Sequence, residues 1–452
     1  MERKLSKRAL TLKPSPIQEL SHLAQRCNAI NLAEGFPDFP APMELKEAAI
    51  GAISADFNQY RHVQGVCDYI AWTMKLNQGL DVDPVKNITI CCGQSEAFAA
   101  TILSVVDQGD EVLLFDPAYE TYEACITMAG GTPVYVALNP PHWTLNVEEL
   151  MAAFTSQTKA IVLNRKTILM VCVDLLPLKL KKLQVIHCFG RAFKSSPHNP
   201  TGKVFSKNEL MIIAELCCRM DCLAITDEVY EHITFDSEHI SLASLPGMLD
   251  RTIITSSMSK TYSVTGWRVG WAVAPFEIAS SIRNIHVKLT DSAPAPFQEA
   301  ALVALKSGPE YLKKLRMEYK ERRDFIVDSL GEVGFKVHFK PQGAVFVFAE
   351  LPETCVISDV EYVAELIKVA GVAAVPGCGF FHDKGKFKKE DCSQSAIGSI
   401  QRPESVETSE ILHTAKNYRN RYIRFAYCKS KCTLLAAADK LSKYKDKLGG
   451  VT

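Results

Sequence analysis

Short apolar runs of strand length alternate with longer stretches of helical periodicity from about residue 87 onwards. The first runs cover residues 88–92, 111–115 and 159–164, and they are rich in aliphatic and β-branched side chains. Two more follow. One covers residues 222–230, including the turn after the strand, and the other covers residues 252–255. Alternation of this kind is typical of βα units, so it predicts an α/β fold with a mostly parallel central sheet.

A long helical pattern over residues 310–330 precedes a change in organisation. Its apolar residues recur at helical spacings, and Gly331 is expected to end it. Beyond it we expect a smaller α/β domain made of residues 335–351, a helix near 360–369, a strand near 421–428 and a final helix from Thr433.

The chain length supports two domains. Its 452 residues exceed the usual size of a single domain, and 47% of them are hydrophobic, enough for a large core. We expect a large domain at residues 46–310 and a small domain at residues 311–452. The N-terminal segment, residues 1–45, is expected to join the small domain.

Two segments interrupt this pattern. Residues 165–195 are apolar at 168–173 and basic further on, and they are too short to span a bilayer. Because long unpatterned loops are uncommon inside compact domains, we interpret them as an insertion, with a genuine surface loop as the alternative. Residues 384–416 are rich in Lys, Glu, Ser and Gln without an apolar period, which predicts a disordered, solvated insertion.

Charge and cysteine usage narrow the classes of partner. The chain has 51 basic and 51 acidic residues, so no bulk charge favours nucleic acid or an anionic membrane. A small molecule or a second copy of the chain is expected instead. The 15 cysteines are scattered without CxxC spacing, so no metal site is expected and a reducing compartment fits best. The basic N-terminus lacks the apolar core of a signal peptide, which predicts a cytoplasmic protein.

The segment at residues 256–271 gathers a lysine, several hydroxyls and an arginine in one turn-rich stretch between two strand-like runs. A lysine at a strand end can form a Schiff base with a carbonyl carbon when burial and a second cation lower its proton affinity. Lys260 is the candidate lysine, and Arg268 would be the second cation. Arg268 and the hydroxyl of Ser257 could also bind a phosphate. A solvated lysine on a surface loop is the structural alternative.

Two further stretches can contribute to the same site. After the strand at 88–92, Gly93 opens a helix whose N-terminus would place Ser95 and Glu96 near a phosphate. The strand at 222–230 delivers Asp227, which could simply cap a helix. Its functional role would be to keep a cofactor ring nitrogen protonated, so that the ring accepts electrons.

The string SxSKTxxxTGWRxGW, from Ser257 to Trp271, resembles the signature of the pyridoxal-phosphate aminotransferases of fold type I. The class includes the aspartate, tyrosine and kynurenine aminotransferases. The resemblance covers roughly residues 29–448 apart from the two interrupting segments. It is closest to the branch of kynurenine aminotransferase and glutamine transaminase, whose members often also cleave cysteine S-conjugates.

The resemblance implies a role for further residues. It implies that Gly35 helps to hold the substrate carboxylate, that Tyr119 stacks on the cofactor ring and that Arg424 pairs with the substrate α-carboxylate. A snorkelling surface arginine is the alternative for Arg424. Asn199 and Tyr230 would contact the phenolic oxygen of the cofactor. Tyr60 matches a tyrosine that reaches the cofactor phosphate of the neighbouring subunit, which implies a homodimer.

The combined site has three groups of residues. The catalytic group is Lys260, Asp227 and Tyr230, and the substrate-binding group is Gly35, Asn199 and Arg424. Pyridoxal 5'-phosphate would be held by Ser95, Glu96, Tyr119, Asn199, Asp227, Tyr230, Ser257, Lys260, Arg268 and Tyr60.

The expected function is transamination between an L-amino acid and a 2-oxo acid in two half-reactions. The amino acid would be of the aromatic, kynurenine, glutamine or methionine type. Two alternatives stay open: a pyridoxal-phosphate β-lyase acting on cysteine S-conjugates, and a catalytically silent relative disrupted by residues 165–195.

Overall fold

The computed structural model describes residues 4–12, 14–164, 193–194, 197–235, 238–239, 241–382 and 418–449. Residues 384–416, predicted to be a disordered insertion, lie outside this described part of the chain. Of the predicted insertion at residues 165–195, only Phe193–Lys194 lies inside it.

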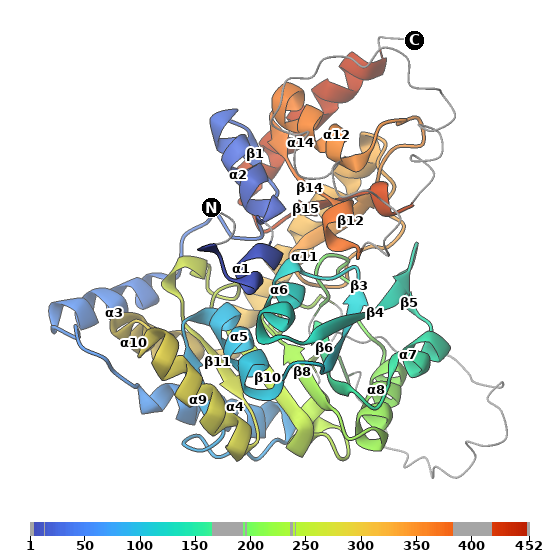
Figure 1. Cartoon of the computed structure of the whole chain (residues 1–452). Coiled ribbons are helices and arrows are strands. Elements are labelled where there is room, and N and C mark those ends of the chain that lie inside the picture. Colours follow the sequence, from blue (N-terminus) through green and yellow to red (C-terminus); the bar gives the residue numbers. More distant parts are fainter. Residues whose placement is uncertain are drawn as a thin grey trace.

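An eight-stranded sheet forms the centre of the larger part of the molecule (Figure 1), in the order β2-β11-β10-β8-β6-β3-β4-β5. Its strands are β2 (Ile88–Cys91), β3 (Glu111–Asp116), β4 (Thr132–Asn139), β5 (Thr144–Leu145), β6 (Thr158–Asn164), β8 (Leu223–Asp227), β10 (Thr252–Ser257) and β11 (Gly270–Val273). Pairing is parallel from β10 through β8, β6 and β3 to β4, and antiparallel around β11 and at β5. The predicted α/β fold with a mostly parallel sheet is confirmed.

Helices cover both faces of this sheet. Alternate residues of β3 face opposite sides: Leu113 belongs to a core shared with Leu210 of α8, whereas Leu114 belongs to a core shared with Phe98 of α5. Burial on both faces explains why the strands are apolar runs rather than alternating patterns. The helices of this part are α3 (Met43–Ser54), α4 (Gln64–Gln78), α5 (Gly93–Val105), α6 (Glu120–Ala129), α7 (Val147–Ala153), α8 (Lys207–Arg219), α9 (Phe276–Thr290) and α10 (Ala295–Leu305).

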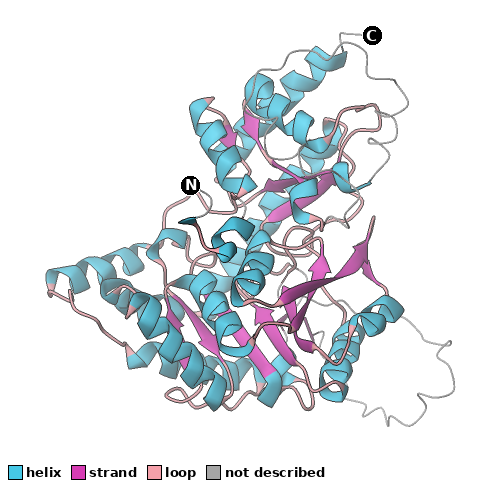
Figure 2. Cartoon of the chain, viewed as in Figure 1, coloured by secondary structure: helices cyan, strands magenta, loops and turns pink. Residues whose placement is uncertain are grey.

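A smaller three-stranded sheet, β12-β15-β14, lies in the upper part of Figure 2, with helices around it. It consists of β12 (Phe346–Glu350), β14 (Val375–Pro376) and β15 (Tyr422–Ala426), with α12 (Asp359–Glu365) and α14 (Lys431–Gly449) nearby. The N-terminal elements α2 (Pro16–Arg26) and β1 (Ile30–Asn31) join this part, because β1 pairs with β13 (Val372–Ala373). Helix α11 (Pro309–Glu332) runs between the two parts.

The remaining elements are short. They are α1 (Lys7–Thr11), β7 (Phe193–Lys194), β9 (Glu238–His239), the 3₁₀ turns η3 (Leu242–Ser244), η4 (Leu249–Arg251), η5 (Thr265–Trp267), η7 (Gly377–Phe380) and η8 (Tyr418–Asn420), and the π turn η6 (Leu366–Ala370). None of the helices in the described residues is long and apolar enough to cross a membrane.

Helix ends follow local chemistry, with one difference from the sequence pattern. Ser206 and Glu209 form the expected capping box at the start of α8. The predicted end of α11 at Gly331 was too early, because this glycine lies inside the helix. Gly334, with φ of 97°, makes the turn and donates to the carbonyl of Gly331 at 3.0 Å.

Candidate active site

The predicted site residues converge because five strand termini lie on one edge of the large sheet. Asn164 and Asp227 are register partners at the carboxyl ends of β6 and β8. Strand β11 runs in the opposite direction, so its first residue, Gly270, pairs with Ser257 at the end of β10 and with Cys91 at the end of β2. Ligands of α/β sheets bind at this carboxyl edge.

Arg268 and Gly93 meet in a tight contact at this edge. A Cβ built on Gly93 would lie 2.2 Å from Nη2 of Arg268, and Gly93 has φ of 80°, so only glycine fits. Nη2 of Arg268 donates to the carbonyl of Cys92 at 3.1 Å, and Nη1 donates to the carbonyl of Thr265 at 2.9 Å. The guanidinium is thereby held beside the N-terminus of α5.

The start of α5 offers backbone donors to an anion. The helix begins at Gly93 without a side-chain cap at Cys92, and Ser95 lies in its first turn. Ser257 is buried at the end of β10. It is the register partner of Gly270, which on its other side pairs with Cys91, just before α5. A helix N-terminus, a guanidinium and a hydroxyl are the donor set that suits a phosphate.

The side chain of Glu96 is directed to other partners. Its carboxylate accepts from the backbone N–H of Cys92, from Nδ1 of His286 at 2.9 Å and from the hydroxyl of Thr290 at 2.8 Å. Hydrogen bonding to His286 keeps the pKa of Glu96 below its usual value, although burial opposes this. A carboxylate repels phosphate, so the side chain of Glu96 does not suit the phosphate itself, and the assignment of Glu96 to the cofactor stays a prediction.

Lys260 lies on the loop after β10, as predicted. Its Nζ donates to the carbonyl of Gly35 at 2.8 Å. Burial lowers the pKa of Lys260, and the positive charges of Arg424 and Lys429 act in the same direction. Arg424 and Lys429 are therefore cations that act on this amine, and the role of Arg268 as its second cation stays a prediction.

Asp227 is the buried acid of the site. Burial raises its pKa to about 6, although hydrogen bonds from Tyr122 and Val229 oppose this. The hydroxyl of Tyr122 donates to Oδ2 of Asp227 at 2.7 Å, and the N–H of Val229 donates to Oδ1 at 3.2 Å. A carboxylate left in such a dry place is stabilised by a cationic N–H partner. A protonated ring nitrogen is such a partner.

Tyr122 was missed in the sequence. It accepts from Nδ2 of Asn164 at 3.0 Å, and Oδ1 of Asn164 accepts from the backbone N–H of Asn199 at 3.1 Å. The hydrogen bonds therefore continue from Asp227 through Tyr122 and Asn164 to Asn199. The only signal in the sequence was the hydroxyl of Tyr122 on a helix face that is otherwise apolar, because a buried tyrosine hydroxyl usually has a hydrogen-bond partner.

Arg424 is a buried cation, and the snorkelling alternative is wrong. It is 1% exposed and its guanidinium lies between the rings of Phe346, at 4.1 Å, and Phe380, at 4.6 Å. It donates to Oδ1 of Asn199 at 2.9 Å and to the carbonyl of Ala33 at 2.8 Å, while Nε has no partner. Burial lowers its pKa to about 10. In the part of the chain that the structure describes, no carboxylate forms an ion pair with it, so an anionic ligand would complete the site.

Two predicted aromatic residues line the same region. Tyr119 precedes α6 and packs edge-on against Tyr122, with ring centroids 5.7 Å apart. Tyr230 is 4% exposed and packs edge-on against Phe346. Burial raises the pKa of both hydroxyls above their usual range. Tyr60, by contrast, is 79% exposed on the loop between α3 and α4.

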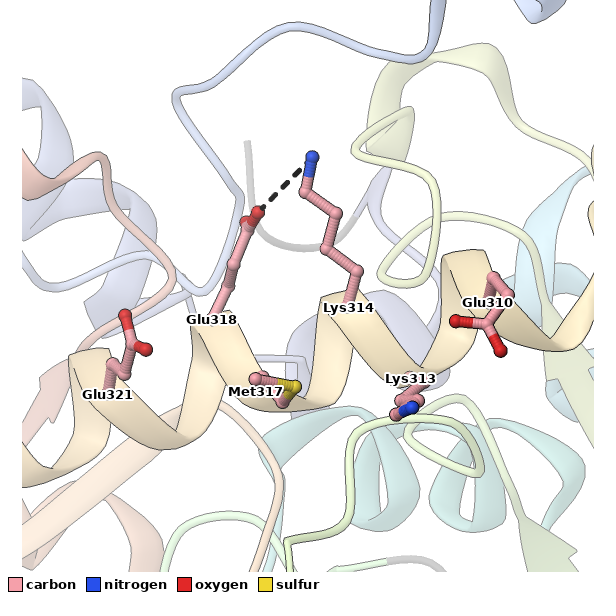
Figure 3. A pocket seen from close by; sticks show the side chains of 6 residues that line it. All are labelled: Glu310, Lys313, Lys314, Met317, Glu318 and Glu321. Atoms are coloured by element: carbon pink, nitrogen blue, oxygen red, sulfur yellow. Dashed lines mark ion pairs between the residues drawn. The ribbon is translucent and has the colours of Figure 1, made fainter.

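A separate hollow of about 330 Å³ lies along α11. Figure 3 shows its lining, which comes from that helix alone: Glu310, Lys313, Lys314, Met317, Glu318 and Glu321. Lys314 and Glu318 form an exposed ion pair at 4.0 Å. None of the strand-end residues takes part, so this hollow is not the active site.

The fold places a buried lysine, a buried carboxylate and two arginines at one edge of an α/β sheet, where enzymes of this architecture bind their ligands. Comparison with known proteins names the family. The sequence profile of aminotransferase class I and II matches residues 28–387. The chain belongs to this family and is a transaminase.

Similar proteins match along almost the whole chain. The kynurenine–oxoglutarate transaminase of Dictyostelium discoideum is 32% identical, over 98% of this chain and 97% of its own. The methionine aminotransferase of Escherichia coli K12 is 30% identical, over 94% of each chain. Among solved structures, the N-succinyldiaminopimelate aminotransferase of Mycobacterium tuberculosis superposes with a TM-score of 0.80 at 32% identity, over 97% of this chain and 99% of that one.

The family implies pyridoxal phosphate, and the residues present fit it. The donor set around Arg268 and Gly93 suits the phosphate, and buried Asp227 suits the ring nitrogen. Lys260 has the lowered pKa that an amine needs for bonding to a carbonyl carbon.

Proposed function

We propose that Lys260 is the cofactor-bearing lysine of this transaminase and that Arg424 binds the α-carboxylate of both substrates. The observation that carries the proposal is the burial of Arg424 without an acidic partner among the described residues. Arg424 donates to the carbonyl of Ala33, and the amine of Lys260, whose pKa is lowered, donates to the carbonyl of Gly35 two residues further on. A bidentate carboxylate would complete the hydrogen bonding of the guanidinium. Gly35 and Asn199 would contribute to the same substrate position, since their loops contact Lys260 and Arg424.

The chain's own groups then have separate tasks. Pyridoxal phosphate, when bound, supplies an electron sink that stabilises negative charge at the substrate α-carbon. Ser95, Ser257 and Arg268 would hold its phosphate, and Glu96 would lie beside it on the first turn of α5. Asp227 would keep a proton on the ring nitrogen. The amine of Lys260 would accept the α-proton of the amino acid and later release it.

Three aromatic or amide side chains would orient the cofactor ring. Tyr119 supplies a flat apolar surface for stacking. Tyr230 and Asn199 would donate hydrogen bonds to the phenolic oxygen. Asn199 is supported in this role by the hydrogen bond that Asn164 accepts from its N–H.

We propose an L-amino acid of the aromatic, kynurenine, glutamine or methionine type as amino donor and a 2-oxo acid as acceptor. The names of the relatives support this range, since they include a kynurenine–oxoglutarate transaminase and a methionine aminotransferase. The division into a large domain at 46–310 and a small domain at 311–452 is proposed with it. The scattered cysteines favour the cytoplasm as its location.

We also propose a homodimer in which Tyr60 contacts the cofactor phosphate of the other subunit. Its 79% exposure makes the ring accessible to a second copy. Mixing Tyr60→Ala and Lys260→Ala proteins tests this, because a hybrid dimer would contain one intact site. Recovery of activity on mixing is expected. Additive activity of the two proteins without recovery, at concentrations where sedimentation shows a dimer, would contradict the role of Tyr60.

A two-stage reaction tests the function. With an amino acid alone, the cofactor-loaded protein should form about one 2-oxo acid per site and stop, and continuous turnover should require a 2-oxo acid. Acceptor-independent release of pyruvate and ammonia from a cysteine S-conjugate would instead favour a β-lyase. A protein that binds the cofactor but forms no product would be the silent relative.

A further inference from the structure

The loop at residues 33–38 is held through its backbone carbonyls by three buried or partly buried cations. Arg424 donates to the carbonyl of Ala33, Lys260 to that of Gly35 and Lys429 to that of Phe36, each at 2.8 Å. Carbonyls that face cationic donors form strong hydrogen bonds, so these three contacts fix the path of the loop.

Two of these three cations have another task in the reaction. In the proposed function, Lys260 bonds to the cofactor and Arg424 binds the substrate carboxylate. The task of Lys260 competes with its bond to the loop, because one amine serves both, whereas Arg424 has its unpartnered Nε to offer to a carboxylate. Lys429 has no such task, so it remains the constant cationic anchor of the loop through both half-reactions.

The surroundings of Lys429 fit an anchor. It is 2% exposed, and its Nζ lies 3.8 Å from the centroid of the Phe36 ring as well as at the Phe36 carbonyl. The next residue, Ser430, donates its backbone N–H to Asp38, whose other carboxylate oxygen accepts from Thr433 at 2.6 Å. The chain after β15 therefore holds both ends of the Phe36–Asp38 segment.

The position of Gly35 explains why the anchor matters for the chemistry. A Cβ on Gly35 would lie 2.3 Å from Cζ of Phe346, so the backbone is in contact with this ring. Phe346 in turn stacks under the guanidinium of Arg424. A shift of the loop would therefore move both the acceptor of the Lys260 amine and a wall of the carboxylate site.

We propose that Lys429 is a positioning residue that keeps the Gly35–Phe36 peptide in place while Lys260 changes partner and Arg424 binds the substrate carboxylate. The inference rests on the proposed roles of Lys260 and Arg424. Because Lys429 fixes the loop, the carbonyl of Gly35 keeps its position and can accept a hydrogen bond from the Lys260 amine whenever that amine is not bonded to the cofactor.

Lys429→Met tests the proposal, with Lys440→Met as the matched control. Lys440 lies on α14 and also donates to a backbone carbonyl, that of Gly371 at 3.4 Å, but it makes no contact with the loop at residues 33–38 among those described. In the cofactor-loaded Lys429→Met protein, hydrogen exchange of the peptide covering residues 33–39 should speed up about tenfold, the effect of losing one charge-assisted hydrogen bond. The KM for amino and oxo acids should rise by a similar factor, while kcat changes less than about threefold.

Unchanged exchange and unchanged KM in Lys429→Met, with the control also unchanged, would overturn the proposal. If Lys429→Met fails to fold, Lys429→Gln, which keeps an N–H donor without the charge, is measured in the same way and should show smaller changes in the same direction. Failure of the proposed function is seen separately. It would appear as a visible cofactor band that survives in Lys260→Ala, whatever the result at Lys429.

Discussion

The backbone N–H of Asn199 donates to Oδ1 of Asn164 at 3.1 Å, although 35 positions separate them in the sequence. Asn164 ends β6, and Asn199 contacts Arg424. The two ends of the connection that contains residues 165–195 therefore lie next to each other in the active site. A much shorter connection can join them.

Deleting residues 165–195 is expected to raise solubility and transaminase activity together. The segment carries the apolar run 168–173, and a shorter connection restricts Asn199 more, since the entropy of loop closure grows with length. An error of about 1 Å in a catalytic group can change a rate by about a hundredfold. Specific activity and the soluble fraction are compared at saturating cofactor. Equal or lower activity in the deletion protein would show that the segment is a native part of the site.

Asp227→Asn should leave cofactor binding partly intact but lower kcat by about a hundredfold or more, the range for losing one preorganised charge. The amide keeps one acceptor oxygen, which can accept from Tyr122 or from Val229 but not from both, and it cannot hold a proton on the ring nitrogen. Single-turnover kinetics measure the effect. Tyr122→Phe is the matched variant, because it leaves the carboxylate in place and removes only the hydrogen bonds of the hydroxyl to Asp227 and Asn164, and a far smaller loss is expected. Wild-type turnover in Asp227→Asn would argue against the assignment.

The raised pKa of Asp227 also predicts a pH dependence of stability in the cofactor-free protein. The folded-state pKa, about 6, lies above the ordinary value of 3.8, so ionisation of the buried group destabilises the fold. The penalty is absent below pH 3.8 and complete above pH 6. Relative to Asp227→Asn, the wild type should lose about 3 kcal/mol of unfolding free energy between these limits. Denaturant unfolding of both proteins measures it, and a difference that does not change with pH would contradict the shift.

Arg424→Ala should raise the KM for amino acids and for 2-oxo acids together, by about a hundredfold, since one carboxylate site serves both half-reactions. Arg251→Lys, which keeps a charge at an exposed pair with Asp221, is the control and should change neither value. If only one class of substrate were affected, Arg424 would not be the shared anchor.

Much of the fold could be predicted because the sheet is buried on both faces. The strands that end at Asn164, Asp227 and Ser257 are apolar runs followed by polar residues, and parallel strands bring such ends to one edge. Lys260 and Arg268 shared one motif, so both could be assigned to the site from the sequence.

Contacts between distant segments could not be predicted in the same way. Tyr122 and Asp227 are 105 residues apart, and nothing local marks the tyrosine as a hydrogen-bond donor to that carboxylate. Arg424 acts on Lys260 because it contacts Asn199 and Ala33, which lie 225 and 391 positions away in the sequence. No sequence motif marks Lys429. Its hydrogen-bond partner, Phe36, lies 393 residues earlier in the chain, so no local pattern could link the two.

The visible absorption of the cofactor-loaded protein tests the assignment of Lys260. Wild type and Lys440→Met should show the absorption band of a lysine-linked pyridoxal phosphate, and borohydride should fix the cofactor on the peptide that contains Lys260. Lys260→Ala should lack the band and remain unlabelled. A band and a borohydride-fixed cofactor that persist in Lys260→Ala would show that another amine carries the cofactor and would contradict the account.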